Sequence, residues 1–241
     1  LLYCLFKHKK FNKKTVYAGM LVGGCNCAGL VLQQIGLATS SVSKVSFISG
    51  LYIIFVPILR MFAGRIPKKR VWIAIAVACT GTYLMCITDS LTFELGDIST
   101  LISTIFFALQ IIFIAVYSKD VDPVAFCGVQ QTFTSLICGI LMLVFENPQS
   151  SALSNIVLET AYVVYCSGLI AQIIQNKYQK LVDTNVASLI MSLESVFGAI
   201  SGVIILNQTM SLREMIGGVL IFAAVLIAES DGLLKWKKRT E

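Results

Sequence analysis

The sequence predicts an all-α polytopic membrane protein, and three features of the chain lead to this fold class. First, 56% of its 241 residues are hydrophobic and only 13% are charged, which gives a mean hydropathy of +0.82. Second, the apolar residues form segments of about 18–24 residues, long enough to cross a bilayer core of ~30 Å as helices. Third, Lys and Arg are concentrated in the loops of one side. A soluble domain of this length would need more polar surface.

Eight apolar segments are expected to form full transmembrane helices, because each is long enough to cross a membrane with modest tilt. They follow a short apolar stretch, residues 1–6, and a basic loop, residues 7–14. Their approximate limits are 15–36, 42–63, 71–88, 97–117, 123–145, 156–176, 184–207 and 212–230. Residues 232–241 after the last segment are expected to form a basic tail.

The positive charges predict how the protein is oriented. All but two of the 19 Lys and Arg residues lie in loops on one side of the expected helices, and the exceptions are Lys44 and Arg213. Basic loops remain in the cytoplasm, so this side, with the C-terminal tail, is expected to be cytoplasmic. We expect a multi-pass protein of the plasma membrane, specifically of a bacterial cell membrane.

A weak internal repeat relates the two halves of the chain. A shift of 142 positions places residues 15–89 on residues 157–231 without a gap, so that three apolar segments fall on three others. Gln33 and Gln34 meet Gln175 and Asn176 in this alignment, and Tyr52 meets Glu194. The gapless register and the matched polar pair favour a true repeat.

The two copies differ in charge at equivalent loops, which indicates opposite orientations in the membrane. The loop at 64–70 is strongly basic, whereas its counterpart at 206–212 carries no charged residue. Inverted repeats are typical of secondary transporters. We expect an inverted five-plus-five repeat, N-terminally truncated here by roughly 45–50 residues to about eight full helices. Residues 1–89 would be a partial first repeat and residues 97–231 the second.

Three stretches of the chain resemble the EamA-type transporters of the drug/metabolite transporter (DMT) superfamily. The first runs from Lys44 to Pro57 and is followed by Gly64-Arg65 and Gly81. The second includes Gly96-Asp97, 106–109 and Asp122-Pro123, and the third runs from Ala187 through Glu194 to Gly217-Gly218. Together they cover nearly the whole chain. The family often has Glu-Pro where this chain has Glu194-Ser195, and Gly-Glu where it has Asn207-Gln208.

This resemblance implies ten helices, cytoplasmic termini and the transport of a small metabolite, amino acid or drug. We therefore expect a secondary transporter, an exporter or exchanger, that works by alternating access. A membrane-embedded receptor or scaffold, or an intramembrane enzyme without transport, is the alternative. The lone His8 in a basic loop disfavours the enzyme, and no cofactor or metal is expected, because the eight cysteines include no CxxC pair. The expected partners are the lipid bilayer, a small organic solute and a coupling proton. The sequence is also compatible with a homodimer, and no nucleic-acid partner is expected.

Glu194 is the leading candidate for a residue of the substrate cavity. It lies near the middle of segment 184–207, where a carboxylate costs on the order of 2.5–3.5 kcal/mol to insert. It would bind a cationic substrate or a proton, or it would be protonated and hydrogen-bonded to a neighbouring helix. Tyr52, its partner in the repeat, is either a second cavity residue or an ordinary core tyrosine.

Amide side chains within the apolar segments form the second group of candidates. An amide in lipid needs hydrogen-bonding partners, so these residues are expected either to bridge helices or to line a polar cavity. Lys44 at the outer end of its segment would attract an anionic substrate or would simply extend its amine to the interface. The amides are Gln33, Gln34, Gln110, Gln130, Gln131, Gln172 and Gln175.

Small residues at helical spacing are expected to form packing faces, because they allow another helix backbone to approach closely. One face includes Ser195, Gly198 and Gly202, and a second includes Gly19 and Gly23. Cys25-Asn26-Cys27 is interpreted as helix packing in preference to a metal site.

Overall fold

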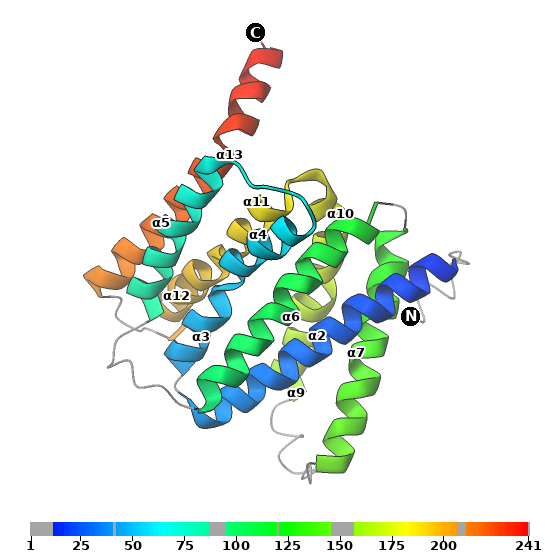
Figure 1. Cartoon of the computed structure of the whole chain (residues 1–241). Coiled ribbons are helices and arrows are strands. Elements are labelled where there is room, and N and C mark those ends of the chain that lie inside the picture. Colours follow the sequence, from blue (N-terminus) through cyan, green and yellow to red (C-terminus); the bar gives the residue numbers. More distant parts are fainter. Residues whose placement is uncertain are drawn as a thin grey trace. The chain divides into compact units, whose positions relative to one another are not determined.

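The computed structural model describes residues 12–40, 42–86, 95–119, 121–145, 157–206 and 211–240. These residues form the helices α2 (Lys13–Thr39), α3 (Val42–Gly50), α4 (Tyr52–Phe62), α5 (Lys69–Cys86), α6 (Leu95–Tyr117), α7 (Pro123–Phe145), α9 (Val157–Tyr162), η1 (Val163–Ala171), α10 (Gln172–Tyr178), η2 (Gln179–Leu181), α11 (Thr184–Met191), α12 (Leu193–Leu206) and α13 (Leu212–Thr240) (Figure 1). Their limits agree with the apolar segments of the sequence to within about three residues, except that α13 continues to Thr240 through the stretch expected as a basic tail.

Four stretches of the described chain are long and apolar enough to cross a membrane. They are α2, residues Val45–Phe62 of α3 and α4, α6 and α7. Together with the absence of strands among the described residues, they make this an all-α membrane protein. The number of crossings and the inverted repeat remain predictions.

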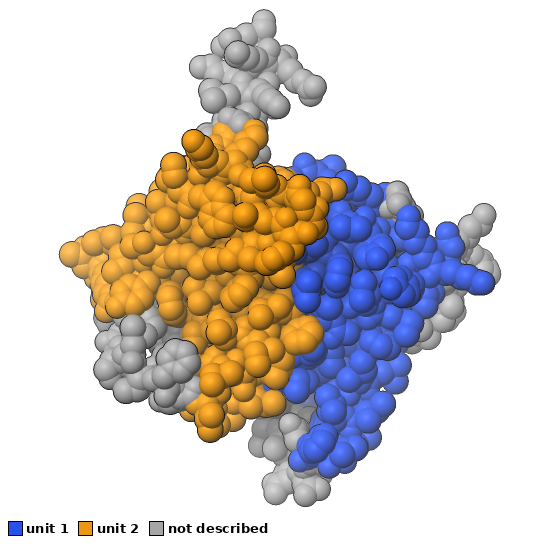
Figure 2. Space-filling view, in the orientation of Figure 1, with its two compact units in different colours: residues 1–31, 109–182 blue, residues 32–108, 183–241 orange. Residues whose placement is uncertain are grey.

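The chain divides into two compact units (Figure 2). Unit 1 comprises residues 1–31 and 109–182, and unit 2 comprises residues 32–108 and 183–241. Helices α2 and α6 each contribute residues to both units. Each unit therefore combines residues from both halves of the sequence repeat. Within each unit, segments that are far apart in the sequence are in contact.

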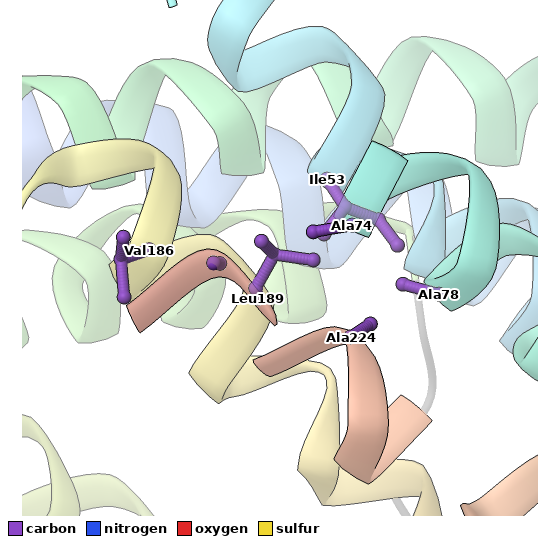
Figure 3. Packing of buried hydrophobic residues seen from close by; sticks show 7 residues of the cluster. Ile53, Ala74, Ala78, Val186, Leu189 and Ala224 are labelled. Atoms are coloured by element: carbon purple, nitrogen blue, oxygen red, sulfur yellow. The ribbon is translucent and has the colours of Figure 1, made fainter. Parts of the chain in front are cut away.

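Unit 2 has an apolar core where α4, α5, α11 and α13 meet (Figure 3). Leu189 of α11 packs with Ile53 of α4, Ala74 and Ala78 of α5, and Ala224 of α13, all nearly inaccessible to solvent. The alanines keep the helices close together. Helices α5 and α13 approach closely at Gly81 of α5, where a Cβ atom would lie 2.6 Å from the Gly217 carbonyl oxygen. The helices α5 and α13 accordingly lie side by side (Figure 1).

Two apolar segments that the sequence predicts as single helices are interrupted at one residue each. Leu51 separates α3 from α4, and its ψ of −4° departs from the helical value of about −42°. Its N–H donates to the Ile48 carbonyl, only three residues earlier, and Thr104 also donates to that carbonyl. Ser192 separates α11 from α12 in the same way, with a ψ of −15°.

Side-chain hydroxyls explain the second interruption. The Ser192 hydroxyl donates to the Leu189 carbonyl at 2.7 Å, and Ser188 donates to the Asn185 carbonyl at 2.8 Å. Hydroxyls that bond the preceding turn bend helices. With the 142-residue shift, the interruptions at Leu51 and Ser192 fall within one residue of each other.

The segment expected at 156–176 is not a uniform α-helix. Residues Val163–Ala171 form a π-helix, η1, between α9 and α10. Such widened turns are rare and frequently occur at functional sites. The Gly168 carbonyl of this π-helix accepts a hydrogen bond from the Gln131 side-chain amide of α7.

Candidate functional site

Tyr52 and Glu194 lie at matching positions of the two interrupted segments in unit 2. Tyr52 is the first residue of α4 and Glu194 is the second residue of α12, so each lies within two residues of an interruption. Tyr52 is partly buried and the Glu194 side chain is exposed.

A buried amide network in unit 1 joins α7 to α10. The Gln130 side chain is completely buried, and its Nε2 donates to Oε1 of Gln172 at 3.1 Å. Its Oε1 accepts from Nδ2 of Asn176, which is also completely buried, at 3.2 Å. Asn176 Oδ1 is buried without a hydrogen-bond partner among the described residues. One acceptor in this network is therefore left for another donor.

A second amide pair extends the network toward α6. Gln175 Nε2 donates to Oε1 of Gln179 at 3.0 Å, and Gln179 Nε2 donates to the Ile111 carbonyl of α6 at 2.6 Å. The four amides at 172, 175, 176 and 179 follow helical spacing, so α10 and η2 present them as one stripe. The sequence analysis did not select Asn176 or Gln179, although the same spacing points to both.

The remaining predicted amides differ in their surroundings. Gln33 of α2 donates to the Ser49 hydroxyl of α3 at 2.8 Å in unit 2, whereas its neighbour Gln34 is exposed. Gln110 of α6 is buried, with 5% of its surface exposed. Most of these residues thus bridge helices. The alternative role of these glutamines, lining a polar cavity, stays a prediction.

Four predicted residues lie where the structure gives a backbone but no description of the side chain. Lys44 is in α3, and Ser195, Gly198 and Gly202 are in α12. The proposed electrostatic role of Lys44 and the packing face on α12 therefore lie outside the described side chains and stay predictions.

Gly19 and Gly23 lie where α2 packs against α7 within unit 1. A Cβ atom on Gly19 would lie 2.7 Å from the Val129 side chain, and one on Gly23 would lie 2.7 Å from the Gln130 carbonyl oxygen. Thr134 of α7 donates to the Gly23 carbonyl at 3.0 Å. Glycine is required at both positions because the backbones approach so closely.

An ion pair in unit 2 was missed by the sequence analysis. Arg60 Nη1 in the last turn of α4 lies 2.7 Å from Oδ1 of Asp183, which precedes α11 and caps it by accepting from the Asn185 N–H at 2.9 Å. Burial alone would raise the pKa of Asp183. The hydrogen bonds from Arg60 and Asn185 and the charges of Arg60 and Arg65 outweigh this and lower the pKa.

Metal chemistry has no support in the described part of the chain. Among those residues there is no group of three or more His, Cys, Asp or Glu side chains that would hold a metal ion. The arrangement instead offers hydrogen-bonding amides in unit 1, and a carboxylate and a tyrosine at matching positions of the two interrupted segments in unit 2. These groups suit reversible binding of a polar solute.

Comparison with known proteins identifies the family. The EamA-like transporter family model matches residues 94–229, which is more than half of the chain. An "Uncharacterized transporter" from Archaeoglobus fulgidus is 25% identical over 210 residues, covering 87% of this chain and 67% of that protein. One crystal structure resembles the fold with a TM-score of 0.68 and 12% identity, covering 91% of this chain and 89% of the other.

These matches confirm the resemblance drawn from Lys44–Pro57, Gly96-Asp97 and Ala187–Gly218. They also support a transporter in preference to an enzyme. The chain belongs to the EamA-like transporter family, and it is a multi-pass membrane transporter of the drug/metabolite transporter type.

Proposed function

We propose that the protein is a secondary carrier that moves a small organic solute, such as an amino acid or a drug-like molecule, by alternating access. The observation that carries this proposal is the pairing of Tyr52 with Glu194. The two residues match in the 142-residue repeat and lie just after equivalent helix interruptions in unit 2. Carriers commonly bind solutes and ions at discontinuous helices related by an inverted repeat.

Glu194 is the proposed site for a cationic group of the solute or for a coupling proton. Its side chain is exposed in the structure, and no ion pair to it occurs among the described residues. A carboxylate in a membrane segment is costly unless it serves binding or proton transfer.

The carrier is tested by transport assays in proteoliposomes with the variant Glu194→Gln. We expect the variant to fold but to lose flux or its dependence on a pH gradient, because the amide cannot release a proton or carry a negative charge. Glu214→Gln is the matched control. Glu214 is partly buried at the start of α13, and its side chain accepts hydrogen bonds from Ser211, which glutamine can also accept, so this substitution should leave flux unchanged.

Full flux and an unchanged pH dependence in Glu194→Gln would refute the assignment of the site to Glu194. A solute screen by thermal shift on the wild-type protein provides the substrate for the assay. Solutes with an ammonium group are expected to stabilise the wild type more than the Glu194→Gln variant.

We further propose a plasma-membrane location with the C-terminus in the cytoplasm, and a five-plus-five arrangement of inverted repeats. Single cysteines in a cysteine-free background test the orientation. A cysteine at Arg65, in the exposed basic loop after α4, should react with an impermeant reagent only after the membrane is opened. A cysteine at Ser150 should react from outside. The opposite pattern would contradict the proposed orientation.

A homodimer is the assembly to be tested alongside. Cross-linking of the protein in membranes over a range of protein-to-lipid ratios separates a true dimer, whose yield stays constant, from chance collisions, whose yield falls with dilution.

A further inference from the structure

The helices α2 and α7 pack in parallel within unit 1 with a constant offset in residue number. Thr134 of α7 donates to the Gly23 carbonyl of α2, an offset of 111 residues. One turn further along both helices, Cys27 and Cys138 are separated by the same offset of 111. Because residues four apart lie on one helix face, this register places the two cysteines opposite one another.

The two sulfur atoms are in direct contact. Cys27 Sγ lies 3.4 Å from Cys138 Sγ, so that one thiol donates a weak hydrogen bond to the other. The nearby backbones hold this geometry, since Gly23 allows α2 to approach the Gln130 carbonyl of α7 closely. Cys27 has 4% of its surface exposed, whereas Cys138 is only partly buried.

We propose that Cys27 and Cys138 form a redox modification site, at which a peroxide converts the two thiols into a disulfide that links α2 to α7. No feature of the transport cycle is needed for this inference, so it stands apart from the proposed carrier function. The observation that supports it is the contact between two thiols that lie far apart in the sequence, at a position where α2 packs closely on α7.

The chemistry proceeds in two steps and requires only hydrogen peroxide as the oxidant. The Cys138 sulfur, the more accessible one, attacks a peroxide oxygen; the O–O bond breaks, and a sulfenic acid and one water molecule result. The Cys27 sulfur then attacks the sulfenic sulfur, forming the S–S bond and releasing a second water. The two thiols lose two electrons and two protons, and the peroxide is reduced to two waters.

The disulfide needs only a small adjustment of the structure. The sulfurs must approach from 3.4 Å to a bond length of about 2.05 Å, which side-chain rotation can provide when the backbones are already close. Such a link would hold α2 and α7 in the arrangement they already have.

The test uses the full chain in membranes treated with hydrogen peroxide, followed by blocking of free thiols and mass spectrometry of the peptides. We expect two of the eight thiols to be lost and to return after reduction with dithiothreitol, and the linked peptides to contain Cys27 and Cys138. Survival of all eight thiols, or a link between other cysteines, would overturn the proposal. This readout needs no variant and so does not depend on a substituted protein folding.

Matched variants sharpen the test. In Cys27→Ala, Cys138 should stop at the sulfenic acid, which dimedone captures, and the linked peptide should disappear. Cys25→Ala is the control: Cys25 is on the same helix two residues away and is also buried, but it makes no sulfur contact with Cys138. It should form the link as the wild type does. Loss of the link in Cys25→Ala, or its persistence in Cys27→Ala, would contradict the assignment.

Discussion

Arg60 Nη1 lies 2.7 Å from Asp183 Oδ1, and this ion pair joins the end of α4 to the start of α11. The two helices belong to the two interrupted segments of unit 2, so the pair joins α4 to α11, the helix that the 142-residue shift matches with α3. Asp183 serves both as the partner of Arg60 and as the cap of α11, and substitutions can separate these roles.

Asp183→Asn should remove the ion pair but keep the cap, since asparagine caps helices as well as aspartate does. We expect a loss of about 0.5–1 kcal/mol in the free energy of unfolding at neutral pH, because the Asp183 side chain is half exposed. Asp183→Ala should cost about 1 kcal/mol more through loss of the cap. Thermal unfolding in detergent measures both, and equal losses in the two variants would contradict this division.

The contribution of the ion pair should depend on pH in one direction. The pKa of Asp183 is lowered in the folded protein, so its stabilisation is fully present above the ordinary aspartate value of about 4. It is lost as pH falls through the lower, folded-state pKa. The difference in stability between the wild type and Asp183→Asn should therefore shrink below about pH 4. A difference that grows on acidification would refute the assignment.

Gly23→Ala should destabilise the packing of α2 on α7. Its Cβ would lie 2.7 Å from the Gln130 carbonyl oxygen, a backbone atom that cannot rotate away. Overpacking of this kind costs about 1–3 kcal/mol. Gly139→Ala in α7 is the matched control, because a Cβ there meets nothing within 4 Å and alanine favours the helix. Unfolding in a denaturant series should show a loss only for Gly23→Ala.

Gln130→Leu should unfold at lower temperature than the wild type. The substitution keeps a similar volume but leaves the Gln172 and Asn176 amides without their partner at a completely buried position. Each unsatisfied buried group costs about 1–3 kcal/mol. Gln34→Leu is the control, since Gln34 is exposed on α2 and should change stability by less than about 0.5 kcal/mol. Equal effects of the two substitutions would argue against a structural role of the network.

The Tyr52 hydroxyl should act through Glu194 in transport. Tyr52→Phe keeps the ring and removes only the hydroxyl, so we expect reduced flux in a folded protein. In the Glu194→Gln background the same substitution should have little further effect, because neighbouring groups that act together are not additive. Independent, multiplying effects on the transport rate would show that the two residues act separately.

The sequence predicted most of the helices because each is a long apolar segment bounded by charged loops. The limits of α6 and α7 agree with the expected segments to within two residues. The interruptions at Leu51 and Ser192 could not be predicted in this way. They depend on hydroxyl groups that bond to backbone carbonyls, and neither residue is a proline. The one proline nearby, Pro57, lies inside α4.

The candidate site was predicted only as a set of residue types. Glu194 and the glutamines stand out because they are polar within apolar segments, and that local contrast is visible in a sequence. Their partners are not, because Gln130 bonds to Asn176, 46 residues away, and Arg60 pairs with Asp183, 123 residues away. Such pairs depend on which helices pack together and with what register, which hydrophobicity alone does not specify.

The π-helix Val163–Ala171 determines which way the following amides face. Each residue is rotated about the helix axis relative to its neighbour, by about 100° in an α-helix and by less in the wider π-helix, so one residue more or less in η1 would turn the whole of α10. Gln172 and Asn176 would then no longer face Gln130 of α7. The length of η1 thus sets the rotational orientation of α10. Shortening η1 by one residue would turn the amide side chains of α10 toward a different helix.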